Sequence, residues 1–211
     1  MERSPAVCGV ILAAGESTRM GRDKALLPWP PGSAGNETFL SAAIRSLSQF
    51  SDLVIVVAGH NASALAPIVY ANGANLVENP DPDRGQFSSL QAGLQAVLSF
   101  GRDAALITLV DRPPVAAATL DALRTAFDRE LRAGKWAVVP DCGGKHGHPF
   151  FASRELMEVF LRAPATATAR QIEHQYQEHI HYEAIADAGL VQNIDTPAEY
   201  DALTAIPAKN P

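Results

Sequence analysis

Short apolar runs alternate along this chain with longer segments in which apolar residues recur at helical spacing, and this alternation limits the folds that the chain can adopt. Short apolar runs are typical of strands buried on both faces, as in parallel sheets covered by helices. The runs span residues 7–14, 52–59, 74–78, 103–111 and 136–140. The helical segments between them span residues 39–50, 62–72, 88–100 and 117–133. The pattern predicts an α/β fold with a mostly parallel central sheet, and ligands at the carboxyl ends of the strands.

The last third of the chain is less regular. It contains a glycine-rich turn at 142–148, a short apolar run at 149–152, two helical segments and a strand-like stretch at 190–195. With 211 residues, 47% of them hydrophobic, the chain suits one core, which predicts a single domain over 1–211. The Pro- and Gly-rich stretch 28–37 is predicted to be a loop, either a mobile flap or an ordinary surface connection.

Charge and cysteine content exclude several classes of protein. The formal net charge of -6 argues against nonspecific nucleic-acid binding, which needs clustered Lys and Arg. The two cysteines, Cys8 and Cys142, show no paired metal-ligand spacing, and no run approaches the length of a membrane span. We therefore expect a cytoplasmic protein with no nucleic acid and no membrane as partner, although a local cationic loop can still bind a small anion.

The loop after the first apolar run has the residues of an anion-binding site. Gly15 and Gly21 permit close backbone approach, and Arg19 and Lys24 provide donors and charge for phosphate oxygens. The loop matches neither the P-loop nor the three-glycine dinucleotide pattern. The residues alone leave two interpretations open, an anion-binding loop and an ordinary glycine-containing connection.

The segment LAAGESTRMGRDKALLP, at 12–28, closely resembles the first loop of the nucleotidyltransferases that include molybdenum cofactor cytidylyltransferase and molybdopterin-guanine dinucleotide synthase. The resemblance implies a Rossmann-like three-layer α/β/α sandwich. It also implies that Arg19 and Lys24 hold the phosphates of a nucleoside triphosphate. The residues implied to lie near the base and ribose are Leu12, Ala13, Ala14 and Gly15.

Two acidic residues close strand-like runs, Asp111 after 103–110 and Asp195 at the end of 190–195. Each alone is as consistent with a cap or turn as with a metal ligand. Two carboxylates beside a triphosphate suit Mg²⁺. The resembled family carries Asp-X-Pro and Asp-Thr-Pro motifs at these places, which implies that both residues bind the metal and that Asp111 is catalytic. Arg112 departs from the pattern, since cytidylyltransferases of this type usually have Gln there.

Base choice is indicated by two segments. The stretch 79–94 resembles the second base-recognition segment of cytidylyltransferases. Guanylyltransferase relatives tend to show Leu-Ala-Gly-Gly in the first loop and Gly-Pro-Leu-Ala-Gly in the second, so both segments of this chain favour CTP over GTP. The resemblance implies nucleotide binding by four residues of this stretch: Asn79, Gly85, Ser88 and Ser89.

The segment containing Gly147, His148 and Pro149 resembles the family's Gly-His-Pro, which faces the acceptor substrate. By its sequence alone His148 is better explained as a turn residue than as a catalyst. Further on, where the family has Gly-Asp-X-Gly-Ala-Arg, this chain keeps only Ala169 and Arg170.

Together these features predict an enzyme that transfers CMP from CTP to a phosphorylated acceptor, molybdopterin or the molybdenum cofactor, with Mg²⁺ and release of pyrophosphate. A molybdoenzyme would then receive the product. The alternatives are a guanylyltransferase, a sugar- or alditol-phosphate nucleotidyltransferase, and a noncatalytic nucleotide-binding partner of a molybdoenzyme.

Overall fold

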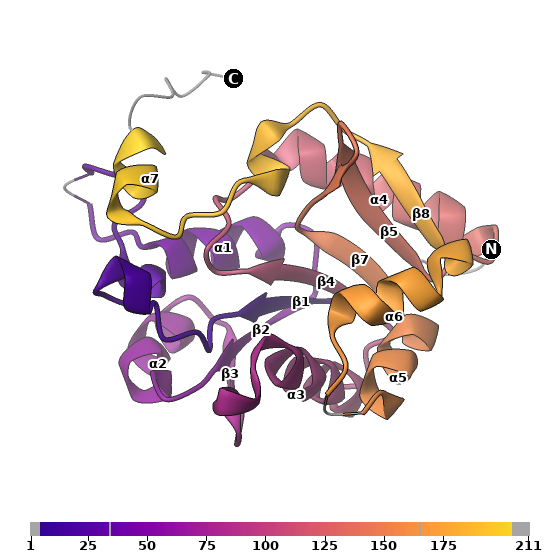
Figure 1. The fold of residues 1–211 in the computed structure, drawn as a ribbon, viewed down its shortest axis with the longest axis horizontal. Helices are drawn as coiled ribbons and strands as arrows, with labels where there is room; N and C mark the ends of the chain where they lie inside the picture. The colour runs from indigo at the N-terminus through magenta and orange to yellow at the C-terminus, as the bar shows by residue number, and fades with distance from the viewer. Residues whose placement is uncertain (1–4, 34, 165, 204–211) are drawn as a thin grey trace.

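A computed structural model describes residues 5–33, 35–164 and 166–203. They form an eight-stranded sheet in the order β3-β2-β1-β4-β7-β5-β6 (Figure 1). The eighth strand, β8, lies off this path and also pairs with β5. The strands are β1 (Val7–Leu12), β2 (Leu53–Ala58), β3 (Asn75–Glu78), β4 (Ala104–Leu109), β5 (Ala137–Cys142), β6 (Lys145–His146), β7 (Phe150–Ser153) and β8 (Ile180–Ala184). Pairs β1·β2, β1·β4, β2·β3 and β5·β8 are parallel, and β6 and β7 are antiparallel to their neighbours. The predicted mostly parallel sheet is confirmed.

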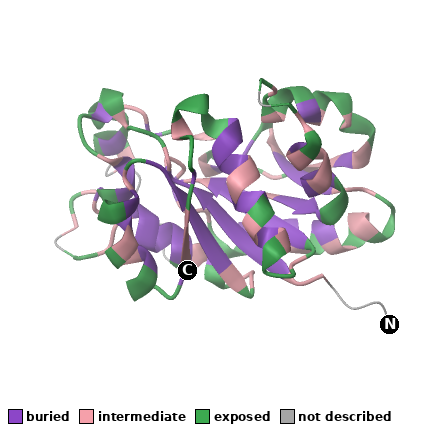
Figure 2. Ribbon diagram, turned by 90° about the horizontal axis from the view of Figure 1, so that it is seen from below, coloured by how far each residue is buried: buried purple, intermediate pink, exposed green. Residues whose placement is uncertain are grey.

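Helices cover both faces of the sheet, which confirms the predicted three-layer α/β/α sandwich. The α-helices are α1 (Phe39–Ser48), α2 (Ala62–Ala71), α3 (Gln86–Ser99), α4 (Ala117–Arg132), α5 (Arg154–Arg162), α6 (Ala169–Gln175) and α7 (Pro197–Ala202). One core cluster joins α1, α2 and α4 to the sheet, and a second joins α3, α5 and α6 to the opposite face. Figure 2 shows the buried strands between helices whose outer sides are exposed.

Short 3₁₀ helices connect several of these elements: η1 (Thr18–Met20), η2 (Lys24–Leu26), η3 (Pro82–Arg84), η4 (Gln177–His179) and η5 (Ala188–Val191). The predicted strand over 190–195 is wrong, because this stretch begins in η5 and continues as irregular chain. Asp187 accepts a hydrogen bond from the Gly189 amide at 3.0 Å and starts the turn. Leu190 and Ile194 are buried without joining the sheet. Their burial accounts for the apolar residues that suggested a strand.

A third, small core ties the chain segment after β1 to the C-terminal segment. Its buried members are Met20, Leu27, Phe39, Ile194 and Tyr200. The Tyr200 hydroxyl also donates to the Pro28 carbonyl at 2.7 Å. This core fixes the position of the chain on both sides of Asp195 relative to the loop that carries Arg19 and Lys24.

The predicted loop over 28–37 is closed at its base, where Pro28 and Thr38 form an antiparallel bridge and the Trp29 amide donates to the Glu37 carbonyl at 2.8 Å.

None of the helices formed by the described residues has the length and apolar character needed to span a bilayer. The two ends of the predicted domain, 1–4 and 204–211, lie outside the described residues.

Helix α3 packs closely on the sheet at Gly93. A Cβ atom at Gly93 would lie 2.9 Å from Val10 Cγ1 and 2.9 Å from Val57 Cγ2, and valine side chains have little rotational freedom to move away. Overpacking of this kind costs about 1–3 kcal/mol, which exceeds the gain of up to about 1 kcal/mol from replacing glycine with alanine in a helix.

We therefore expect Gly93→Ala to lower the free energy of unfolding by about 1 kcal/mol or more, measured by urea denaturation. The matched control is Gln95→Ala, an exposed position on the same helix, which should change stability little. A Gly93→Ala variant as stable as the control would contradict this description of the α3 interface.

Candidate active site

The charged residues singled out in the sequence meet at the carboxyl ends of β1 and β4. Lys24 Nζ lies 2.6 Å from Asp195 Oδ1 and 3.4 Å from Asp111 Oδ2. Arg19 Nη2 lies 3.1 Å from the same Asp195 oxygen. Because β1 and β4 are adjacent and parallel, the loop after β1 and the acid after β4 emerge at one edge of the sheet. The predicted convergence of two cations and two acids is present.

The loop between β1 and η2 has a defined conformation. Ser17 adopts φ +52°, a left-handed conformation that is uncommon for a residue with a side chain. Its hydroxyl accepts a hydrogen bond from the Lys24 amide at 3.1 Å, and Asp23 caps η2 by accepting from the Ala25 amide. Lys24 is thereby directed inward, with only 11% of its side chain exposed, whereas the Arg19 side chain is 69% exposed.

Asn61 lies in the turn between β2 and α2, holds this loop with its side chain, and was not singled out from the sequence. Its side-chain amide donates to the Ala13 carbonyl at 2.9 Å and to Asp23 Oδ2 at 2.6 Å. Its own carbonyl accepts from the Gly59 amide. Asn61 immediately precedes α2, so its position in sequence suggests a helix cap, but its side chain makes no cap bond. Sequence position alone therefore pointed to a different role.

Asp111 and Asp195 have the properties that a divalent metal ion requires. Asp111 Oδ1 is buried and has no hydrogen-bond partner. The hydrogen bond from Lys24 is the main reason that the pKa of Asp195 lies below its usual value, so this carboxylate is ionised at neutral pH. In the described part of the chain no group of three or more His, Cys, Asp or Glu side chains could hold a metal. Two carboxylates with phosphate oxygens are a sufficient set for Mg²⁺.

The four predicted nucleotide-binding residues of 79–94 lie in one internally bonded segment, which runs from the end of β3 into the first turn of α3. The buried Asn79 side chain donates to Ser88 Oγ at 2.8 Å and to Ser89 Oγ at 3.0 Å. Ser88 Oγ in turn donates to the Gly85 carbonyl at 2.8 Å. The two hydroxyls therefore hold the loop in shape, while Gly85, at φ +91°, and Gln86 face the adjoining pocket. Gln86 was not expected from the sequence.

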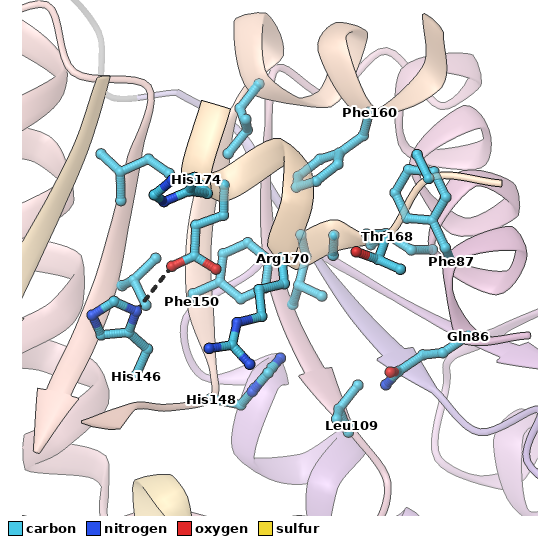
Figure 3. A pocket seen from close by; sticks show the side chains of 18 of the residues that line it. Gln86, Phe87, Leu109, His146, His148, Phe150, Phe160, Thr168, Arg170 and His174 are labelled. Atoms are coloured by element: carbon cyan, nitrogen blue, oxygen red, sulfur yellow. Dashed lines mark hydrogen bonds and ion pairs between the residues drawn. The ribbon is translucent and has the colours of Figure 1, made fainter. Parts of the chain in front are cut away.

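A pocket of about 1380 Å³ lies between the Gly85 loop and the segment from β5 to β8, and Leu12 and Leu109, the last residues of β1 and β4, line it. Its floor is apolar, including Leu12 and Ile107, and its rim includes the cationic side chains of Arg84, Lys145 and Arg170. Figure 3 shows Arg170, His146 and His148 on one side of this pocket and Gln86 on the other. A pocket with an apolar floor and a cationic rim suits a ring system that carries negative charge.

Two of the three residues in the Gly-His-Pro segment line this pocket. Gly147 and His148 line it, whereas Pro149 is buried and does not. A Cβ atom at Gly147 would lie 2.5 Å from the Leu190 carbonyl oxygen, so glycine is required there by close packing. Burial, followed by the charge of Arg112, lowers the pKa of His148 to about 3, so its imidazole is neutral at physiological pH.

A mostly parallel sheet with a cationic loop facing two acids at its carboxyl edge defines a class of enzyme that acts on nucleoside triphosphates. The chain belongs to the MobA-like NTP transferase family, whose domain model matches residues 9–180, and it is therefore a nucleotidyltransferase.

Several characterised proteins are similar over nearly the whole chain. Molybdenum cofactor cytidylyltransferase of Escherichia coli is 31% identical over 193 residues, covering 90% of this chain and 92% of that protein. Molybdenum cofactor guanylyltransferase of Xanthomonas euvesicatoria is 28% identical over 198 residues, covering 92% and 93%. The crystal structure of Rv0371C from Mycobacterium tuberculosis in complex with manganese has a TM-score of 0.69 and 26% identity, covering 94% of this chain and 97% of that one.

Gly15 allows a test that separates ligand binding from folding. A Cβ atom there would meet nothing within 4 Å, and the residue is not among those with positive φ. We expect Gly15→Ala to fold with unchanged thermal stability but to bind CTP at least about ten-fold more weakly, because the methyl group occupies space needed by the nucleotide. Calorimetric titration with CTP and Mg²⁺ measures this; equal affinity in the variant would remove Gly15 from the nucleotide site.

Proposed function

We propose that this nucleotidyltransferase transfers CMP from CTP to a phosphorylated acceptor of the molybdopterin type, with Mg²⁺ as cofactor. The observation that carries the proposal is the contact of Lys24 with both Asp111 and Asp195. Lys24 and Asp111 follow the strands β1 and β4, whose last residues, Leu12 and Leu109, line a pocket of about 1380 Å³. Relatives named for transfer to the molybdenum cofactor support this choice of acceptor.

Asp111 and Asp195 would hold the metal ion. The buried, unpartnered Asp111 Oδ1 and the ionised Asp195 fit this role, and the manganese complex of a similar protein supports a divalent ion. When bound, the ion would supply positive charge for the phosphates of the nucleotide. Arg19 and Lys24 would bind the β- and γ-phosphates and stabilise the negative charge that develops on them.

In the proposed reaction an oxygen of the acceptor phosphate attacks the α-phosphorus of CTP. A new phosphorus–oxygen bond forms, the bond from the α-phosphorus to the bridging oxygen breaks, and pyrophosphate leaves. A phosphate monoester has a second pKa of about 6 and is largely ionised at neutral pH, so the attack needs no general base. The residues of this chain would contribute by positioning both phosphates and by stabilising charge.

The choice of CTP over GTP rests on the two base-recognition segments. Ser88 and Ser89 already bond within their own loop, so we assign the base contacts to backbone groups of Leu12–Gly15 and Gly85. Cytidylyltransferase and guanylyltransferase relatives have comparable identities, 31% and 28%. Direct comparison of CTP and GTP as substrates decides between them.

We further propose that residues 1–211 form one domain, that the protein is cytoplasmic, and that a molybdoenzyme receives the product. The free state of both cysteines, Cys8 and Cys142, supports a reducing compartment.

Asp111→Asn provides the test of the metal assignment. Asparagine preserves the shape of the side chain but removes its charge, so we expect pyrophosphate release from CTP, Mg²⁺ and molybdenum cofactor to fall by about 10³-fold or more. The fold should persist, since Lys24 keeps its shorter contact with Asp195. Asp121→Asn, an exposed position on α4, is the matched control and should retain full activity.

Full activity of Asp111→Asn would overturn the metal assignment. Turnover of the wild-type protein with sugar or alditol phosphates but with no form of molybdopterin would replace the proposed acceptor. Nucleotide binding without pyrophosphate release from any acceptor would instead indicate a noncatalytic partner of a molybdoenzyme.

A further inference from the structure

Three of the six buried side-chain atoms that have no hydrogen-bond partner within the described residues belong to Asp111, to its neighbour in the chain and to a histidine of the pocket. They are Asp111 Oδ1, Arg112 Nε and His148 Nδ1. A buried donor or acceptor left without a partner costs about 1–3 kcal/mol, so unpartnered groups gathered in one place require an explanation. A metal ion would satisfy the Asp111 oxygen, but it cannot satisfy the Arg112 nitrogen, which is a donor.

Arg112 is held in place without an ion-pair partner. Within the described residues it forms no salt bridge, and the only hydrogen bond of its side chain is a long one, 3.5 Å from Nη1 to the Leu190 carbonyl. Burial is the main reason that its pKa lies below its usual value, with Asp111 and Asp195 acting in the opposite direction. An arginine that is partly removed from water and lacks a bound carboxylate is stabilised by any anion that reaches it.

The position of Arg112 connects the two halves of the site. It follows Asp111 directly in the chain, and its charge acts on Asp195 and on His148. The Leu190 carbonyl accepts from the His148 amide at 2.9 Å and from Arg112, which holds both residues against the same segment. His148 lines the pocket (Figure 3). Arg112 is therefore next to Asp111 in the chain and close enough to Asp195 and to the pocket-lining His148 for its charge to act on both.

We propose that Arg112 and His148 form a subsite that binds the terminal phosphate of the acceptor and holds it beside the α-phosphate of the nucleotide. The proposal rests on the proposed function, and it names the acceptor's chemical class as a phosphate monoester. Arg112 provides the planar donors that match phosphate oxygens, and the neutral His148 provides one N–H donor. No atom of the subsite is needed to bind the triphosphate, since Arg19 and Lys24 serve that purpose.

The subsite would select acceptors that carry a phosphate group over acceptors that carry only a hydroxyl group. A desolvated arginine beside an unpartnered imidazole favours an oxyanion that carries charge before the reaction begins, and it disfavours a neutral hydroxyl group. Loss of Arg112 should therefore weaken binding of the acceptor and leave binding of the nucleotide unchanged.

Inorganic phosphate is the probe for this subsite. The triphosphate site is first filled with Mg²⁺ and a CTP analogue that has a methylene bridge between the α- and β-phosphorus atoms, and phosphate is then titrated by calorimetry. We expect Arg112→Gln to weaken phosphate binding by about ten- to hundred-fold, as for a lost charged hydrogen bond. Arg112→Lys, which keeps the charge but lacks Nε, should lie between Arg112→Gln and the wild type.

Two further arginine variants locate the effect. Arg132→Gln, at an exposed position at the end of α4, should bind phosphate as the wild type does. Arg170→Gln tests the cationic rim of the same pocket. Loss of phosphate binding in Arg170→Gln but not in Arg112→Gln would overturn the proposal, as would equal binding by Arg112→Gln and the wild type. Unchanged affinity for the CTP analogue in Arg112→Gln shows that the variant is folded.

In turnover assays Arg112→Gln should raise KM for the acceptor by about ten-fold or more and leave KM for CTP unchanged. Turnover with an unchanged acceptor KM in Arg112→Gln would refute the subsite and leave the proposed function intact. Phosphate binding that depends on Arg112, in a protein that turns over no acceptor, would support the subsite and refute the proposed function.

Discussion

The contact between Lys24 and the two carboxylates of Asp111 and Asp195 is the interaction on which the site depends. It joins three segments that are far apart in the chain: the loop after β1, the end of β4 and the C-terminal segment. In this arrangement the ammonium group occupies the region between two acids that a divalent ion would otherwise share. Lys24 therefore keeps the carboxylates close together and balances their charge, and a metal with its bound phosphates offers an alternative partner to each of the three groups.

The fold secures this contact from two sides. On one side the parallel pairing of β1 with β4 places the loop and Asp111 at the same edge, and Asn61 holds the loop through the Ala13 carbonyl. On the other side the small core around Phe39 and Tyr200 fixes the chain that carries Asp195. Both sides limit the movement of charged side chains that have to meet a ligand within a fraction of an ångström.

The sequence predicted what depends on periodicity and on neighbouring strands. The first five apolar runs form strands as predicted, and Asp111 lies where the end of a buried strand places it. Prediction failed where an apolar stretch is buried without pairing: Leu190 and Ile194 pack beneath a turn, and their spacing cannot be distinguished from that of a strand. Asn61 was not recognised from the sequence because the groups that its side chain contacts, the Ala13 carbonyl and the Asp23 carboxylate, come from a segment distant in sequence. The expected role of Ser88 and Ser89 in nucleotide binding stays a prediction, and the structure adds that the Asn79 side chain donates to both hydroxyls.

The most direct test of the central claim is a crystal structure with Mn²⁺ and the methylene analogue of CTP, in which anomalous scattering locates the metal. We expect one Mn²⁺ bound by both Asp111 and Asp195, with Lys24 Nζ moved from the carboxylates to the phosphates. A metal bound elsewhere, or a triphosphate that contacts neither Arg19 nor Lys24, would contradict it.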